Sequence, residues 1–192
     1  MMIKKREEIK MPKTEKLVRR KDKVAFMDVG GDETENFQRM RKFTEITTSK
    51  NAKEYNRQYV DEEVEDNDTI GYAEEKSYAF DEYTGNPVHE KIVNITDDEL
   101  TGDDAVIKVL VVDLSKPVDS KGFKARLRKY AVVPSDEGGE VEAYTYSGAL
   151  KAKGKFQKGT AVISEDGLTA TFTAEEKVNL MNLKEKNEAS AN

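Results

Sequence analysis

The chain has 192 residues, a length typical of one domain. It contains no cysteine, which excludes disulfides, thiolate zinc sites and cysteine nucleophiles. Hydrophobic and charged residues each make up 36% of the sequence, so we expect a modest core beneath a heavily charged surface. No apolar run approaches the roughly 20 residues of a membrane-spanning helix, and we expect no membrane association.

Charge is unevenly distributed along the chain. Residues 1–23 contain ten Lys or Arg and four Asp or Glu, a net charge of +6, whereas the whole chain carries −6. Residues 24–192 therefore carry −12, and such an acidic body binds nucleic acid poorly because phosphate contacts need clustered Lys and Arg. We expect residues 1–23 to form a basic arm, either disordered in the free subunit or ordered against an acidic neighbour.

The folded part is predicted to span residues 24–174. It begins with a short strand over residues 24–29, which ends at a Gly-Gly pair. Residues 33–42 are compatible with a helical turn. Residues 43–49 are rich in β-branched side chains and indicate extended structure.

Two segments with period-two alternation follow, at residues 54–60 and 76–81, and indicate half-buried strands. We expect them to pair across a long hairpin loop over residues 61–72. Their aromatic faces should lie on the core, because each ring buries on the order of 150–250 Å². These faces carry Tyr55, Arg57 and Tyr59 in the first segment and Lys76, Tyr78 and Phe80 in the second.

The hairpin loop is strongly acidic, with six carboxylates in eight residues. Such a cluster cannot enter a core without partners, so a solvated loop is the simplest interpretation. A calcium-binding loop is excluded, because counting from Asp66 places Ile70 and Ser77 where oxygen ligands are needed. The six acidic residues are Asp61, Glu62, Glu63, Glu65, Asp66 and Asp68.

The only predicted α-helix runs from Pro87 to about Ile95. Asn86 is a favourable N-cap residue, and Pro87 suits the first helical position. Val88, Ile92 and Ile95 form an apolar stripe that should pack on the sheet. The single histidine, His89, lies in the first turn without a nucleophile or carboxylate pattern beside it, so we interpret it as a packing or surface residue.

Further strands are predicted over residues 105–114, 123–133 and 141–155, with a closing hairpin over 160–164 and 168–173. A polar C-terminal tail follows at residues 175–192. Gly148 to Phe156 resembles a phosphate-binding loop only superficially, because the glycine spacing is wrong and Phe156 replaces the magnesium-binding hydroxyl. The pattern as a whole predicts a mainly β fold, an antiparallel sandwich or barrel with one short flanking helix and extended arms or loops.

Many short pieces, in order and spacing, resemble the major tail (tail tube) proteins of long-tailed phages of Gram-positive bacteria. The resemblance spans about residues 24–173, and no single piece of it is a catalytic fingerprint. The pieces are Phe37-Gln38-Arg39-Met40, Phe43-Thr44, Thr48-Ser49-Lys50-Asn51, Glu54-Tyr55, Arg57-Gln58-Tyr59-Val60-Asp61-Glu62, Tyr78-Ala79-Phe80-Asp81, Asn86-Pro87-Val88-His89-Glu90, Ala143-Tyr144-Thr145-Tyr146-Ser147-Gly148 and Lys151-Ala152-Lys153-Gly154.

The resemblance implies a structural polymer of the virion tail, assembled in the host cytoplasm, with neither enzymatic activity nor a cofactor. Its subunits would form homohexameric rings that stack into a tube, and DNA would pass through the lumen without specific binding. The acidic hairpin loop would contact the next ring. Tail terminator, tape measure and distal tail proteins are the implied further partners.

A lining that does not bind DNA should be acidic or neutral and polar, since each neutralised phosphate adds sequence-independent affinity. Lys151 and Lys153 oppose a uniformly acidic lining and are expected to pair with Glu54 or Glu75 across strands. The residues expected to face the lumen are Glu54, Asn56, Gln58, Glu75, Ser77, Thr145 and Ser147.

Two alternative functions stay open from the sequence. One is a tube subunit of a contractile tail or a tail-derived particle, which a neighbouring sheath gene would favour. The other is a β-sandwich module that binds a ligand, although such modules commonly display Trp and this chain has none.

Overall fold

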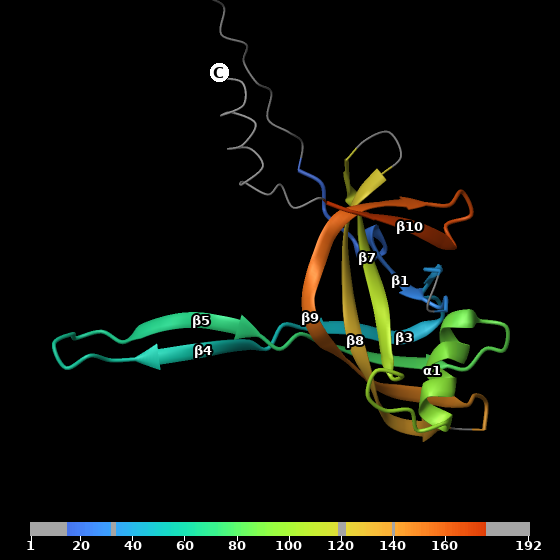
Figure 1. Ribbon diagram of the computed structural model, residues 1–192, viewed down its shortest axis with the longest axis horizontal. Helices are drawn as coiled ribbons and strands as arrows, with labels where there is room; N and C mark the ends of the chain where they lie inside the picture. Colours follow the sequence, from blue (N-terminus) through green and yellow to red (C-terminus); the bar gives the residue numbers. More distant parts are fainter. Residues whose placement is uncertain (1–14, 32–33, 119–121, 140, 176–192) are drawn as a thin grey trace, which may run out of the picture.

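The computed structural model describes residues 15–31, 34–118, 122–139 and 141–175. These residues form a mainly β structure with one α-helix, which confirms the predicted fold class (Figure 1). Most of the predicted basic arm (residues 1–14) and of the C-terminal tail (176–192) lies outside the described residues. The elements are 3₁₀-helix η1 Arg20–Asp22, strands β1 Lys23–Asp28, β2 Phe37–Arg39, β3 Phe43–Ser49, β4 Ala52–Arg57, β5 Asp66–Tyr72 and β6 Glu75–Asp81, helix α1 Pro87–Asp97, and strands β7 Val106–Pro117, β8 Gly122–Gly138, β9 Thr145–Ile163 and β10 Thr169–Ala174.

Six antiparallel strands close into a barrel. Their order is β10-β2-β1-β7-β8-β9, and the barrel closes because β10 pairs with β9 as well as with β2. Phe26 of β1 and Leu110 of β7 lie opposite each other in register and are completely buried inside. Ala125 and Ala161 complete this interior cluster from β8 and β9, where small side chains suit a narrow barrel.

A second layer forms where the sheet extends beyond the barrel. The first part of β9 pairs with β6, and β6 pairs with β3, so β3 is the last strand of the sheet. Tyr78 and Phe80 of β6 are buried together with Tyr146 of β9 and Ile92 of α1. The predicted core placement of the segment 76–81 is therefore confirmed, and α1 covers this face of the sheet.

Helix α1 begins as the sequence predicts. The Asn86 side-chain oxygen accepts a hydrogen bond from the backbone N–H of Val88 at 3.2 Å, and Pro87 occupies the first turn. The apolar stripe is confirmed, since Val88, Ile92 and Ile95 are all buried.

We expect Asn86→Ala to lower the free energy of unfolding by about 1 kcal/mol, because an N–H at the helix start loses its acceptor. Asn94→Ala on the exposed side of α1 is the matched control. It should not lower the free energy of unfolding, since Ala favours helix more than Asn does. Urea denaturation measures both variants. Equal stability of the two would contradict the capping role.

Two local predictions are wrong. The expected helical turn at residues 33–42 is replaced by β2, because Phe37 enters the barrel interior and its backbone pairs with β1 and β10. The expected break between residues 155 and 160 is absent. Instead β9 continues through to Ile163, since β8 offers it an unbroken partner, with Lys158 opposite Arg126.

Candidate functional site: a projecting arm and its anchor

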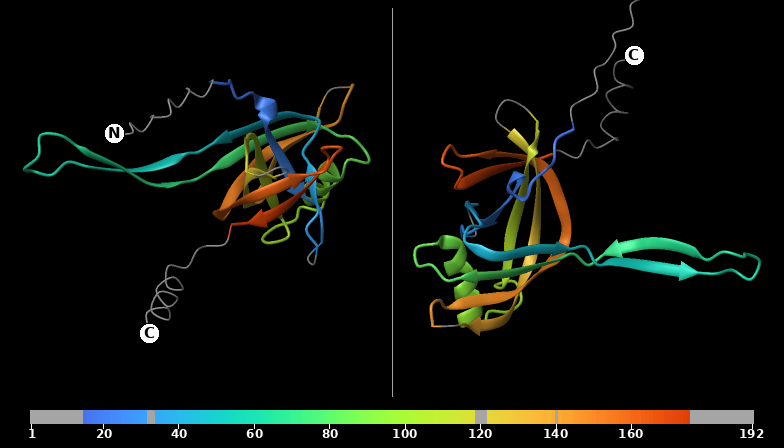
Figure 2. Two further views of the ribbon diagram at one scale, coloured as in Figure 1. Left: turned by 90° about the horizontal axis from the view of Figure 1, so that it is seen from above. Right: turned by 180° about the vertical axis from the view of Figure 1, so that it is seen from behind.

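Strands β4 and β5 form a separate two-stranded sheet that projects from the barrel, which we call the arm, residues 52–72 (Figures 1 and 2). Ala52 pairs with Tyr72 at its root and Arg57 pairs with Asp66 near its tip. The predicted pairing of segment 54–60 with segment 76–81 is wrong. The chain instead forms one long ribbon, in which β3 continues as β4 and the returning side consists of β5 and then β6.

The arm exposes large apolar side chains. Exposed fractions are 46% for Tyr55 and Tyr59, 66% for Ile70 and 62% for Tyr72. The prediction that Tyr55 and Tyr59 lie on the core is wrong, because both side chains are exposed and belong to neither core cluster. An isolated two-stranded sheet is only marginally stable in water, so this surface is suited to packing on another molecule.

The arm also carries three of the residues predicted to face a lumen. Glu54 and Asn56 lie in β4 and Gln58 follows at the tip, all exposed. The Gln58 amide donates to the backbone oxygens of Glu62 at 3.4 Å and Glu63 at 3.5 Å. The prediction of a half-buried strand is therefore wrong for this segment, because β4 is exposed along its whole length and belongs to the arm.

All six acidic residues of the predicted loop lie on the arm. We expected a continuous loop over residues 61–72, but residues 66–72 form β5, because β4 offers them a complete set of backbone partners. Within the described part of the chain, none of the six carboxylates forms an ion pair. Four occupy the tip and two occupy β5, namely Asp61, Glu62, Glu63 and Glu65 and then Asp66 and Asp68.

The arm is joined to the barrel sheet through Asn51 and Ala73. The Ala73 N–H donates to the Asn51 carbonyl at 3.0 Å, and the Asn51 side-chain amide donates to the Ala73 carbonyl at 3.2 Å. Asn51 has a φ of 44°, a left-handed conformation that Asn tolerates better than most residues. The two chain segments are therefore held side by side at the arm's root.

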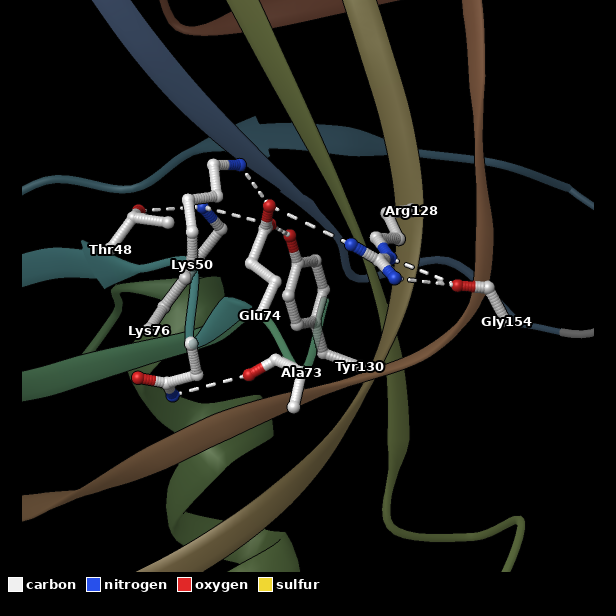
Figure 3. A network of polar contacts seen from close by, with 9 residues as sticks. Thr48, Lys50, Ala73, Glu74, Lys76, Arg128, Tyr130 and Gly154 are labelled. Carbon is white, nitrogen blue, oxygen red and sulfur yellow. Dashed lines mark hydrogen bonds and ion pairs between the residues drawn. The ribbon is translucent and has the colours of Figure 1, made fainter. Parts of the chain in front are cut away.

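A buried carboxylate anchors this root (Figure 3). Glu74 is 9% exposed, and Lys50 Nζ donates a hydrogen bond to its Oε2. The Tyr130 hydroxyl donates to Oε1. Lys76 Nζ lies 3.7 Å from Oε1, and Arg128 Nη1 lies 3.6 Å from Oε2. We call these five side chains the anchor cluster.

The anchor cluster links four strands. Lys76 Nζ donates to the Thr48 hydroxyl oxygen at 2.8 Å, which connects β6 with β3. Arg128 donates from Nε at 3.0 Å and from Nη2 at 2.8 Å to the Gly154 carbonyl, which connects β8 with β9. Because Glu74 lies between these two sets of contacts, it couples the arm's root to the barrel wall.

Charge balance sets the protonation states in the anchor cluster. Burial favours the neutral acid, but hydrogen bonds from Lys50 and Tyr130 and the charge of Lys76 outweigh it and lower the pKa of Glu74 to about 2. Burial lowers the pKa of Lys76, and the Glu74 charge opposes that shift. Burial and the Glu74 carboxylate raise the pKa of Tyr130. Glu74 is therefore ionised at neutral pH, which suits a structural ion cluster.

Sequence reasoning missed the anchor cluster. Its one local signal is Lys76, which alternates with Tyr78 and Phe80 on the face predicted to be buried. A lysine on a buried face needs a carboxylate beside it, and Glu74 is the nearest acidic residue on the same side of the strand. Tyr130 and Arg128 come from a distant strand and give no such signal.

The other four predicted lumen residues share one face of the barrel sheet. Glu75 and Ser77 lie in β6, and Thr145 and Ser147 lie in β9, where Asp81 pairs with Thr145 and Ala79 with Ser147. This face lies opposite the buried aromatic face and is partly exposed throughout. Lys151 and Glu75 are register partners, but their side chains form no ion pair in the described residues. The predicted pairing of Lys153 with Glu54 or Glu75 is wrong, because Lys153 Nζ lies 2.6 Å from Asp103 Oδ1.

His89 has a packing role, as predicted. It is completely buried against the Phe80 ring, with ring centroids 4.2 Å apart. Its Nδ1 accepts from the Tyr83 N–H at 3.2 Å, which leaves Nε2 to donate to the Arg41 carbonyl at 3.0 Å. Burial lowers the pKa of His89, so the neutral ring is favoured.

The described residues contain neither a metal-binding cluster nor a membrane-spanning helix. No group of three or more His, Cys, Asp or Glu side chains in that part of the chain is arranged to hold a metal ion. Within the same residues, no helix has the length and apolar character needed to cross a membrane.

Comparison with known proteins gave structural matches alone. No protein-family model matches the sequence, and no curated protein matches it. A chain in the tail of an empty GTA particle, determined with C6 symmetry, superposes with a TM-score of 0.52 at 15% identity, covering 81% of this chain and 98% of that one. The two chains share a fold. A chain in the 6-fold symmetrised baseplate of the anti-feeding prophage gives a TM-score of 0.41 at 8% identity, covering 77% and 97%.

Proposed function

We propose that this protein is the structural subunit of a phage tail tube, in which homohexameric rings stack and the lumen conducts DNA during ejection. The observation that carries the proposal is the arm, whose exposed tyrosines Tyr55, Tyr59 and Tyr72 have no covering element among the described residues. The fold shared with a chain from a C6-symmetric particle tail supports a tail role. On this proposal the protein has no enzymatic activity, resides in the virion tail and is assembled in the host cytoplasm.

An unpaired edge strand supports ring formation. β3 ends the barrel sheet, and its outer side has no strand partner among the described residues. Exposed strand edges promote pairing with another chain unless they are protected. In a closed ring each subunit covers the edge strand of the next, so that no edge strand stays exposed.

We assign the polar face of β6 and β9 to the lumen. Its side chains are short, uncharged or mixed in charge, which limits attraction to phosphate. With a Debye length of about 8 Å at physiological salt, charge acts on DNA only at close range, and confinement guides the duplex. Glu54, Asn56 and Gln58 extend this polar lining along the arm, while Glu75, Ser77, Thr145 and Ser147 provide it on the barrel sheet.

The acidic tip of the arm is assigned to contact between successive rings. Its distance from the barrel places it beyond the subunit's own body (Figure 2). At the two ends of the tube, tail terminator and distal tail proteins would complete the assembly, and a tape measure protein would occupy the lumen before ejection.

Negative-stain electron microscopy of the concentrated purified protein tests the proposal. We expect rings with six-fold symmetry and tubes built from them. A protein that stays monomeric at every concentration, as measured by sedimentation, would rule the proposal out.

We expect Glu75→Lys to permit tube assembly while increasing the retention of duplex DNA in the lumen and slowing ejection. The slope of the logarithm of the DNA-binding constant against the logarithm of salt concentration should steepen by about one for each added phosphate contact. Glu54→Lys should act in the same direction. Glu99→Lys, at an exposed position after α1, is the control. Ejection at the normal rate from Glu75→Lys particles would show that this face does not line the lumen.

A further inference from the structure

A basic groove contains the anchor cluster, whose five side chains all belong to the groove lining. It has a volume of about 710 Å³ and is lined by nine Lys or Arg side chains and a single carboxylate, Glu74. The cations come from η1 and Arg19 just before it, from strands β1, β2, β6 and β8, and from Lys50 after β3. Three of the nine cations, Lys50, Lys76 and Arg128, already surround Glu74, so the other six have no carboxylate of their own in the groove lining.

Several groove cations have no carboxylate partner in the described residues. Arg20 and Lys21 of η1 form no ion pair there, and neither does Arg126. The guanidinium carbon of Arg126 lies 5.8 Å from the centroid of the Phe156 ring. Clustered unpaired cations repel one another and lower the stability of the subunit. A carboxylate-bearing partner would remove that cost.

Apolar side chains also line the groove. Phe156 is 43% exposed, and Ile46 and Val111 are half-buried. A partner that fits the groove therefore combines acidic side chains with apolar ones. A volume within the roughly 300–1,000 Å³ range of ligand sites is enough for several side chains.

The arm tip has this combination. It carries unpaired carboxylates at residues 61–66. Val60 precedes them and Val64 lies among them, and these two side chains are exposed by 108% and 77%. The arm extends away from its own barrel, so the tip does not reach the groove of the same subunit (Figures 1 and 2). The complementary tip must come from a second copy of this chain.

We propose that the basic groove is the receptor for the arm tip of a second copy of this chain. In this contact, carboxylates of residues 61–66 face Lys21 and Arg126, and Val60 or Val64 packs against Phe156. The proposal rests on the tube assembly proposed above and specifies its inter-ring contact. The contact is head-to-tail, because tip and groove are different surfaces, and it therefore propagates along a tube. It also weakens with added salt, since its charges are largely exposed.

Charge exchange between two variants tests this contact. Glu62→Lys/Glu63→Lys reverses the tip, and Lys21→Glu/Arg126→Glu reverses the groove. Each variant alone should need about tenfold more protein than wild type to form tubes, because attractive pairs become repulsive. An equimolar mixture should recover assembly, since each variant's tip then meets a groove of opposite charge on the other.

The controls reverse equally exposed charges elsewhere. Glu142→Lys/Glu165→Lys matches the tip variant, and Lys124→Glu/Lys155→Glu matches the groove variant. Both should assemble like wild type. If the tip and groove variants also assemble like wild type, or if their mixture shows no recovery, the groove proposal is wrong while the tube proposal stands.

If the wild-type protein forms no tubes, the tube proposal fails, and the contact between tip and groove must be measured directly. Disulfide formation between introduced cysteines provides that measurement. The chain has no cysteine, so single introduced thiols report on one contact each. Mixed under oxidising conditions, Glu63→Cys and Lys21→Cys proteins should form a disulfide-linked heterodimer faster than Glu63→Cys with Lys155→Cys. Equal rates for the two mixtures would overturn the groove proposal.

Discussion

Replacing the arm, residues 52–72, by an Asn-Gly turn should give a folded subunit that forms no tubes. The replacement is geometrically possible because Asn51 and Ala73 are already hydrogen-bonded to each other at 3.0 Å. Asn-Gly favours the tight turn that joins two antiparallel strands. The barrel core and α1 contain no arm residue, so the free energy of unfolding should change by less than about 1 kcal/mol.

The expected loss of assembly is complete, because the variant loses both the exposed tyrosines and the acidic tip. Electron microscopy and sedimentation measure assembly, and thermal unfolding measures the fold. A milder variant, Tyr59→Ser/Tyr72→Ser, keeps the arm but removes apolar area, and should assemble only at higher concentration. Tubes of normal length from the arm-less protein would contradict an assembly role for the arm.

Glu74→Gln should be the most destabilising conservative substitution in the chain outside the hydrophobic core. It leaves Lys76, whose side chain is 8% exposed, and the largely buried Arg128 without their carboxylate. Breaking a buried ion pair from one side costs about 3–5 kcal/mol, and we expect about 3 kcal/mol here because Lys50 is half exposed. Chemical denaturation at pH 7 measures the loss.

The same residue predicts a dependence of stability on pH. The pKa of Glu74 is lowered from 4.5 to about 2 by folding, so its contribution is present above pH 4.5 and is lost as the pH falls from 4.5 toward 2. Wild type should lose stability across this interval, and Glu74→Gln should lose less. If the free energy of unfolding falls equally with pH in the two proteins, the assigned protonation state of Glu74 is wrong.

A double-mutant cycle with Lys76→Met isolates the charge effect. In Glu74→Gln/Lys76→Met the buried cation is gone as well, so the double variant should be more stable than the sum of the two single effects predicts. Strict additivity would mean that Glu74 and Lys76 do not interact. If Glu74→Gln lowers the free energy of unfolding by less than about 0.5 kcal/mol, Glu74 does not stabilise the arm's root as proposed.

Local patterns predicted helix α1 and most strands of the sheet, but not β2 or the full length of β9. Tyr78 and Phe80 alternate with polar residues and are buried, and the stripe through Ile92 packs as expected. The same reasoning failed for Tyr55 and Tyr59, whose alternation is just as regular. Alternation indicates that one face of a strand is apolar, but it does not distinguish a face on the subunit's own core from a face reserved for another molecule.

The sequence predicted those parts of the candidate site whose residues lie together in one strand. The shared face of Glu75 and Ser77 follows from the period of a strand, and register then adds Thr145 and Ser147. The anchor cluster and the basic groove draw their side chains from elements far apart in the sequence, such as η1, β6 and β8. Only the closed barrel brings them together, so no local pattern indicates them.

A structure of the assembled protein by electron cryo-microscopy tests the self-assembly account most directly. The account predicts rings of six copies around an open bore, with the polar face of β6 and β9 on the bore and each arm lying on a neighbouring ring. A monomer with its arm free at every concentration, or an assembly without a bore, would contradict it.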